Sequence, residues 1–208
     1  MKRTIIIIAA VMLCNGVFAQ TTVKLPDPRK DAEMTLYQAL QQRASVRDFS
    51  SRQVTDQTLS DLLWAAVGIN RPDGRLTAPT AVNRQEINVY VCRGDGNYRY
   101  VAKDNCLVKL SDTDVRKDIA GRQTSVAEAP VILVVVADLA KYGEKNPSTV
   151  RYGALDAGFV CQNICLACEA LGLSTVPRAQ MDVEVLKKEL CLTEAQEILL
   201  NHPVGYKK

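Results

Sequence analysis

The sequence predicts one α+β domain, in which a central mixed, mainly antiparallel sheet of about five strands is flanked by helices. A chain of 208 residues is long enough for a single domain with a full-sized core. Residues 130–137 are continuously apolar and rich in β-branched side chains, which is typical of a central strand covered on both faces. Residues 148–171 form the longest helical pattern, which ends at Gly172, a typical C-terminal cap.

The remaining helices follow from apolar periodicity and capping residues. Residues 55–67 carry leucines at helical spacing on one face, and Thr55 or Asp56 is expected as the N-cap. Asp182 has the same capping role for the last helix. The other segments expected to be helical are residues 32–42, 112–120 and 182–190.

The strands are indicated by alternating or β-branched segments separated by turn residues. Gly94, Asp95 and Gly96 predict a hairpin turn, because glycine adopts the backbone angles that tight turns require. Besides residues 130–137, the expected strands are residues 87–92, 98–102, 106–110, 173–177 and 198–205.

Residues 1–19 are expected to be a cleavable signal peptide. Lys2 and Arg3 form a basic start, and residues 4–13 form an apolar run that is too short for a comfortable transmembrane helix. Residues 17–19 resemble a cleavage site, so Gln20 would begin the mature chain. The protein is therefore expected to be exported, with the periplasm as its compartment and without stable insertion into the membrane.

Two alternatives remain open for residues 1–19. The segment could stay attached as an uncleaved anchor, or a lipid could be attached at Cys14. Leu13 is bulky where a lipid-attachment signal prefers a small residue, which favours simple cleavage. Residues 20–31 are polar and contain two prolines, so they are expected to be a linker before a domain at residues 32–208.

The charge balance gives no reason to expect a nucleic-acid partner. The chain has 26 basic and 23 acidic residues and a net charge of +3, which is too small for a concentrated basic surface. No metal site is expected either, because His202 is the single histidine of the chain.

Three cysteines lie on one face of the predicted long helix, at Cys161, Cys165 and Cys168. Their neighbours are apolar and no fourth ligand is near in sequence, so a buried packing stripe is favoured over a metal or iron–sulfur site. A cross-strand disulfide between Cys92 and Cys106 remains possible in an oxidising compartment.

Residues 43–47 have the composition of a phosphate-binding segment. Arg43, Ser45 and Arg47 alternate, which places their side chains on one face of an extended backbone. Planar guanidinium donors and a hydroxyl suit a dianionic phosphate. The alternative is a solvated turn with two surface arginines.

Together with two further segments, this pattern resembles the nitroreductase family. Residues 78–85 (APTAVNRQ), followed at once by a strand, are similar to the family's Pro-Ser-x-x-Asn-x-Gln-Pro segment. The third segment is Gln162-Asn163 on a long helix leading into residues 170–177, with residues 203–205 on the last strand. The resemblance extends from about residue 34 to residue 206.

The resemblance implies a nitroreductase-like fold, an intertwined homodimer and FMN as cofactor at the subunit interface. Arg43 and Ser45 would bind the phosphate, and Arg47 would reach the N1–C2=O edge of the flavin, which becomes negative on reduction. Asn83 and Gln85 would contact the ring or the ribityl chain.

The other cofactor-binding residues implied by the resemblance lie beside these positions or near the C-terminus. Many relatives have Glu-Gly where this chain has Ala179-Gln180, so the substrate preference stays open. Lys207 and Lys208 are candidates for phosphate contacts, with a solvated tail as the alternative. The implied set also contains Ala44, Pro79, Thr80, Val176, Pro177, Arg178 and Ala179.

The implied activity is ping-pong hydride transfer through flavin N5, from NAD(P)H or another reduced donor to an electron-poor acceptor such as a nitroaromatic or a quinone. No protein acid or base is expected, because the cofactor carries the chemistry. Export raises the possibility of a different donor, or of a dehydrogenation instead of a reduction. The alternative function is a non-catalytic flavin-binding or cysteine-based redox module.

Overall fold

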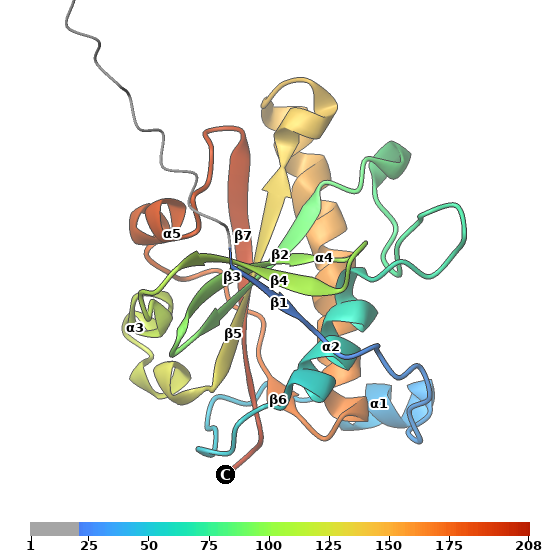
Figure 1. Ribbon diagram of the computed structural model, residues 1–208, viewed down its shortest axis with the longest axis vertical. Helices are drawn as coiled ribbons and strands as arrows, with labels where there is room; N and C mark the ends of the chain where they lie inside the picture. Colours follow the sequence, from blue (N-terminus) through green and yellow to red (C-terminus); the bar gives the residue numbers. More distant parts are fainter. Residues whose placement is uncertain (1–20) are drawn as a thin grey trace, which may run out of the picture.

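The computed structural model describes residues 21–208 as a seven-stranded sheet with helices on both faces (Figure 1). The predicted signal peptide and Cys14 lie outside the described residues. The strand order is β1-β4-β3-β2-β5-β7-β6. The strands are β1 (Thr22–Lys24), β2 (Ile87–Arg93), β3 (Gly96–Val101), β4 (Cys106–Ser111), β5 (Val131–Asp138), β6 (Ser174–Thr175) and β7 (Gln196–Gly205).

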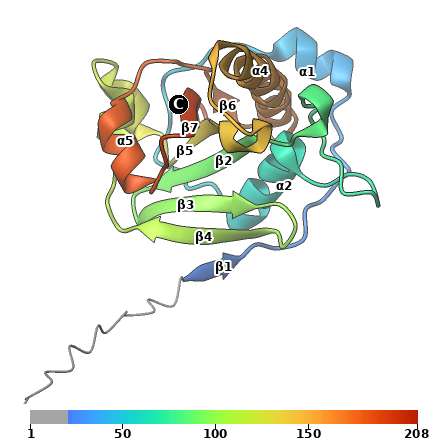
Figure 2. The same cartoon turned by 90° about the horizontal axis from the view of Figure 1, so that it is seen from above.

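Five α-helices and three short 3-10 helices complete the described fold. The α-helices are α1 (Leu36–Gln42), α2 (Asp56–Val67), α3 (Arg116–Ala120), α4 (Pro147–Ala170) and α5 (Val183–Glu189). The 3-10 helices are η1 (Ala81–Asn83), η2 (Thr124–Glu128) and η3 (Leu139–Tyr142). In Figure 2, α2 and α4 cover one face of the sheet, and α3 and α5 lie on the other.

β5 divides the two hydrophobic cores of the domain, as its unbroken apolar sequence predicts. Leu133 and Val135 face the core under α2 and α4, whereas Ile132 and Val134 face the core under α3 and α5. Residues 131–137 are all buried, which confirms the predicted central strand. A strand buried on both faces needs apolar residues at every position, so its sequence does not alternate.

Every pairing between named strands is antiparallel. One isolated parallel bridge, between Ser45 and Thr175, attaches the segment after α1 to the β6 edge. The number of strands is larger than the sequence suggests, because β1 lies within the segment that was expected to be a linker.

That segment is fixed to the domain at several points. β1 pairs with β4, and the side chain of Leu25 is buried in the core. Arg29 then binds the carboxylate of Asp61 in α2 through its backbone N–H at 2.7 Å and through Nε and Nη2 at 3.0 and 2.8 Å. In the structure, residues 22–29 are therefore an integral part of the domain.

The predicted capping residues confirm two helix starts, and the structure corrects two others. Thr55 caps α2 and Asp182 caps α5, each through its side chain. α1 begins at Leu36 rather than at residue 32, because Thr35 and Gln38 form a capping box there. α3 is shorter than expected and begins at Arg116.

The cysteine stripe on α4 is confirmed as packing. Cys161, Cys165 and Cys168 are buried without disulfides, and burial raises the pKa of the Cys161 thiol to about 12. Cys92 and Cys106 lie on β2 and β4, which β3 separates, and both are free thiols, so the structure does not contain the cross-strand disulfide that was left open as a possibility.

No grouping of three or more metal-binding His, Cys, Asp or Glu side chains occurs within residues 21–208. In the same part of the chain, no helix combines the length and the apolar character needed to cross a membrane.

Candidate active site

The predicted phosphate-binding residues lie on an extended segment, residues 43–47, which we call the arginine segment. It follows α1 and lies beside β6, where the Val46 N–H donates to the Thr175 carbonyl at 3.0 Å. The Ala44 N–H donates to Oε1 of Glu169, near the end of α4, at 3.3 Å. The segment is thus attached to the domain through its backbone, which leaves its side chains available.

Both arginines of this segment lack a carboxylate partner in the described protein. Arg47 is exposed and Arg43 is half-buried, and within residues 21–208 neither guanidinium pairs with a carboxylate. Ser45 between them is exposed as well. Two unpaired guanidinium groups beside a hydroxyl are donors suited to a phosphate.

The C-terminal residues pair with residues 49 and 50, directly after this segment. The Ser50 N–H donates to the Tyr206 carbonyl at 2.8 Å, and Lys207 forms an isolated antiparallel bridge with Phe49. The Lys208 ammonium instead forms an exposed ion pair with Glu128 at 2.8 Å. The structure therefore brings the backbone of Lys207 near the arginine segment, whereas the side chain of Lys208 has a carboxylate partner.

Arg178 has a structural role that the sequence did not reveal. Its side chain is 6% exposed and donates to the carbonyls of Ile119 and Ala120 at 3.1 and 2.9 Å and to the side chain of Asn201 at 2.9 Å. Burial, and then the nearby charge of Arg47, lower the pKa of Arg178. Most of its donors are thus used within the protein.

The residues beside Arg178 differ in exposure. Val176 is 2% exposed, so its side chain belongs to the core, whereas Pro177 and Ala179 are exposed. If residues 176–179 face a ligand, Val176 can contact it only through its backbone, whereas Pro177 and Ala179 can contact it through their side chains.

The second predicted segment forms a compact loop, residues 80–85, which we call the 80–85 loop. Val82, Asn83 and Gln85 all have positive φ angles, of 46°, 54° and 52°, which are unfavourable for residues with a side chain. The Thr80 hydroxyl accepts the Gln85 N–H at 2.8 Å. The Gln85 amide donates to the Gly74 carbonyl at 3.1 Å, so both Thr80 and Gln85 shape the loop itself.

A buried carboxylate on α4 fixes the start of this loop. Oδ2 of Asp156 accepts the Ala81 N–H at 2.7 Å, and Asp156 is only 4% exposed. Neither Asp156 nor Glu86, whose pKa it raises, was predicted from the sequence as a functional residue. The available signals were a single acidic residue in an apolar stretch of α4, and a glutamate at the position where the similar family segment has proline.

The arginine segment and the 80–85 loop are anchored at different positions along α4, whose course is visible in Figure 1. The first is bonded to Glu169, next to the last residue of α4, and the second to Asp156, near the middle of the helix; the 13 positions between these two residues correspond to about 20 Å along the helix axis. Within one chain, the two predicted halves of the site are thus attached to separate parts of α4.

Exposed apolar side chains occur on α4 and on both elements anchored to it. Tyr152, Leu155 and Phe159 follow one stripe of α4 and are 45%, 55% and 51% exposed. Val82 in the loop is also exposed, as are Leu36, Tyr37 and Leu40 of α1, which packs against α4. Apolar surfaces of this extent on a folded domain are typical of protein–protein contacts.

His202 lies on β7 and is fully buried. Its Nδ1 lies 3.3 Å from the Thr175 hydroxyl, whereas its Nε2 has no hydrogen-bond partner within the protein. Burial lowers the pKa of His202 to about 3, so the imidazole is neutral at physiological pH. This residue is therefore not a source of positive charge for an anion.

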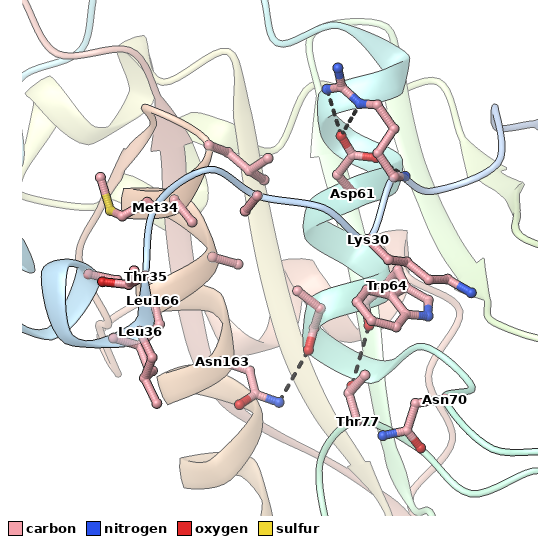
Figure 3. Close-up of a pocket in the computed structure, with 17 residues that line it drawn as sticks. Lys30, Met34, Thr35, Leu36, Asp61, Trp64, Asn70, Thr77, Asn163 and Leu166 are labelled. Carbon is pink, nitrogen blue, oxygen red and sulfur yellow. Dashed lines mark hydrogen bonds and ion pairs between the residues drawn. The ribbon is translucent and has the colours of Figure 1, made fainter.

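A separate cavity of about 410 Å³ lies between the N-terminal segment, α2 and α4 (Figure 3). Its walls include Met34, Trp64 and Leu166, and the Asn163 amide at its edge donates to the Ala65 carbonyl at 3.2 Å. None of the predicted cofactor-binding residues lines this cavity.

Comparison with known proteins shows similarity along most of the chain. A model of the nitroreductase family matches residues 40–206. A curated protein of Methanocaldococcus jannaschii, which has the provisional name of a nitroreductase, is 30% identical over 89% of this chain and 96% of its own length.

Solved structures agree with this similarity. A protein of Ralstonia eutropha, provisionally described as a nitroreductase, has a TM-score of 0.83 at 32% identity, covering 90% of each chain. A protein of Desulfovibrio desulfuricans, described in the same way and solved in complex with FMN, has a TM-score of 0.62 at 23% identity. That match covers 84% of this chain and 87% of the other, and it shows similarity of fold alone.

Proposed function

The chain belongs to the nitroreductase family, and from this premise we propose that it binds FMN at a site completed by two copies of the chain. Membership of the family makes it an FMN-dependent oxidoreductase. The observation that carries the finer proposal is the arginine segment, where two guanidinium groups without carboxylate partners flank an exposed hydroxyl.

The residues of the arginine segment fit the phosphate end of FMN. Arg43 and Ser45 would donate to the phosphate oxygens, and each charge-assisted hydrogen bond of this kind is stronger than a neutral one. Arg47 would face the pyrimidine edge of the flavin, where a cation stabilises the reduced cofactor. The backbone bonds to Thr175 and Glu169 hold the segment in place before the ligand arrives.

The 80–85 loop would supply the second side of the site, from the partner subunit. Asn83 is exposed, and its side-chain oxygen accepts the Gln85 amide at 3.3 Å, so its amide nitrogen would be the group that contacts the ring or the ribityl chain. The separation of about 20 Å along α4 favours a composite site over one built within a single chain. The exposed apolar face on α1 and α4 favours a homodimer that buries it.

When bound, FMN supplies reversible two-electron chemistry between a reduced donor and an electron-poor acceptor. The protein binds and orients the cofactor, and the dimer interface would exclude water from one side of it. We propose NAD(P)H or another reduced small molecule as donor, and a nitroaromatic or a quinone as acceptor.

The visible absorption spectrum of the purified protein, followed by identification of the chromophore released by heat, tests this proposal. We expect released FMN close to one per chain, and turnover with at least one pair of donor and acceptor. A colourless protein that takes up no added FMN would contradict the proposal. Tight flavin binding without turnover of any pair would instead indicate a non-catalytic flavin module.

We further propose that the protein is exported after removal of residues 1–19. N-terminal sequencing of the protein recovered from the native host is the test, with Gln20 expected as the first residue. A lipid-modified chain beginning at Cys14, or a chain retaining its leader, would contradict simple cleavage.

A further inference from the structure

Glu86 is a buried acidic residue to which the proposed function gives no role. It lies between the 80–85 loop and β2, and its side chain is 0% exposed. Neither carboxyl oxygen has a hydrogen-bond partner of ordinary geometry within the described protein. A buried carboxylate without partners is costly, so its protonation state needs an explanation.

Asp156 on α4 is close enough to Glu86 to contribute to the raised pKa of Glu86, and it is itself almost fully buried. Its Oδ2 atom accepts the Ala81 N–H at 2.7 Å, which is the bond that fixes the start of the 80–85 loop. Two carboxyl groups in one buried place cannot both be ionised cheaply, because like charges repel strongly where water is excluded. Burial and then the neighbouring Asp156 raise the pKa of Glu86 to about 7.

The remaining polar groups around the pair come from the elements packed beside it. Tyr142 at the end of η3 has a buried hydroxyl without a partner, and its raised pKa, caused first by burial, keeps that hydroxyl protonated. The Lys141 ammonium donates to the Gln85 carbonyl at 2.5 Å. The Arg84 guanidinium lies 5.9 Å from the centroid of the Tyr142 ring. Neither cation forms an ion pair with Glu86 or Asp156.

We propose that folded Glu86 retains its proton and forms, with Asp156, a positioning pair that holds the 80–85 loop in the shape that binds FMN. The role of the loop rests on the proposed function. Protonated Glu86 would donate a hydrogen bond to the Asp156 side chain, which also accepts the Ala81 N–H. No bond other than these hydrogen bonds forms or breaks.

The backbone of the loop explains why such a positioning pair is needed. Val82, Asn83 and Gln85 occupy left-handed conformations, which persist only where surrounding contacts enforce them. Asp156 supplies one of these contacts through Ala81. When Glu86 loses its proton, a second negative charge appears beside Asp156, and the buried arrangement that anchors the loop becomes unfavourable.

Linkage gives the direction of the pH effect. The folded state retains a proton on Glu86 that the unfolded chain releases at its ordinary pKa of 4.5. The stability contributed by this group is therefore present in full below pH 4.5 and is lost as the pH rises toward about 7. A Glu86→Gln variant retains an uncharged donor at all pH values and should not lose this contribution.

The first measurement is denaturant unfolding of flavin-free protein at pH 5 and pH 8, for the wild type, Glu86→Gln and the exposed control Glu194→Gln. We expect the unfolding constant of the wild type, relative to that of Glu86→Gln, to grow about tenfold or more between pH 5 and pH 8. Glu194→Gln should follow the wild type. If the ratio of the unfolding constants of the wild type and Glu86→Gln did not change with pH, the proposal that folded Glu86 retains its proton would be overturned.

Asp156→Asn provides a second test if Glu86→Gln folds poorly. It retains an oxygen that can accept the Ala81 N–H but removes the like charge beside Glu86. The pH range over which stability falls should then shift toward acid. An unchanged range would contradict the coupling of the two carboxyl groups.

The second measurement is the FMN dissociation constant at pH 6 and pH 8. We expect the affinity of the wild type to fall relative to that of Glu86→Gln by about fivefold or more at the higher pH, because only the wild type gains the destabilising charge. Parallel affinities at both pH values would overturn the positioning role. If neither the wild type nor any variant takes up FMN, the proposed function fails. The denaturant unfolding of the wild type and Glu86→Gln still decides whether folded Glu86 retains its proton.

Discussion

The arginine segment and the 80–85 loop are both candidate parts of one cofactor site, yet the protein builds them in opposite ways. The arginine segment is held by its backbone, and its charged side chains have no partner among residues 21–208. The loop is held by its own side chains, by Asp156 and by Lys141, and even the side-chain oxygen of the exposed Asn83 accepts a hydrogen bond from Gln85.

This difference indicates how the two regions can contribute. The first offers charge and hydrogen-bond donors, so its substitution should weaken anion binding directly. The second offers a preformed shape, so its substitution should act through the conformation of the backbone. Because the two regions lie about 20 Å apart along α4, they can serve one site most simply when two chains meet.

The largest effect is expected from the exposed apolar side chains on α4. Replacing Leu155 and Phe159 together by Glu places two charges in the proposed interface, which should abolish the dimer and the retention of FMN. Val183→Glu, an exposed apolar position on α5, is the matched control and should retain both. Light scattering and flavin content measure the result, and a monomeric variant that still binds FMN tightly would break the composite-site interpretation.

Substitution in the arginine segment should have the next largest effect. Arg43→Ala and Arg47→Ala should each weaken FMN binding by about tenfold to a hundredfold, the cost of a charge-assisted contact of about 1.5–3 kcal/mol. Arg122→Ala, at an exposed site beyond α3, is the control. Fluorescence titration of FMN measures the affinities, and unchanged values for both variants would remove the phosphate site from this segment.

Arg178 should contribute to the stability of the fold, in contrast to the arginines at positions 43 and 47, which should contribute to ligand binding. Arg178→Met removes the donor of the Ile119 carbonyl and of the Asn201 side-chain oxygen in the core, so the free energy of unfolding should fall by about 3 kcal/mol. Denaturant unfolding of Arg178→Met beside Arg47→Ala is the measurement. Equal stabilities of the two variants would show that the buried network is not needed for the fold.

The loop should respond more weakly. Thr80→Ala removes the acceptor of the Gln85 N–H and should cost about 1 kcal/mol of stability, with a loss of FMN affinity of a few fold. Thr80→Ser retains the hydroxyl and should behave like the wild type. If Thr80→Ala weakened FMN as much as Arg43→Ala, the hydroxyl of Thr80 would be a ligand contact rather than a support of the loop.

The parts of the fold that depend on local chemistry were predictable from the sequence. The apolar run at residues 130–137 predicted the central strand, and Gly172, with a φ of 66°, ends α4 as expected. There the Leu173 N–H donates to the Cys168 carbonyl at 2.7 Å, which completes a Schellman motif.

The parts that depend on contacts between distant segments were not predictable. β1 has only three residues, and its pairing with β4 leaves no periodic signal in the sequence. Tertiary packing buries Arg178. It also buries Glu86 and Asp156 beside the 80–85 loop. The sequence suggested the residue types suited to FMN, but it could not show that the two segments are anchored at separate positions of one helix.

Complementation in mixed dimers tests the composite site most directly. One chain would carry Arg43→Ala with Arg47→Ala, the other Thr80→Ala with Asn83→Ala, and the two would be co-expressed with different affinity tags and purified through both. If each site uses the arginine segment of one chain and the loop of the other, the mixed dimer has one intact site and should bind one FMN per dimer with wild-type affinity. Mixed dimers without a wild-type site would show that both halves come from the same chain, and would contradict the proposed arrangement.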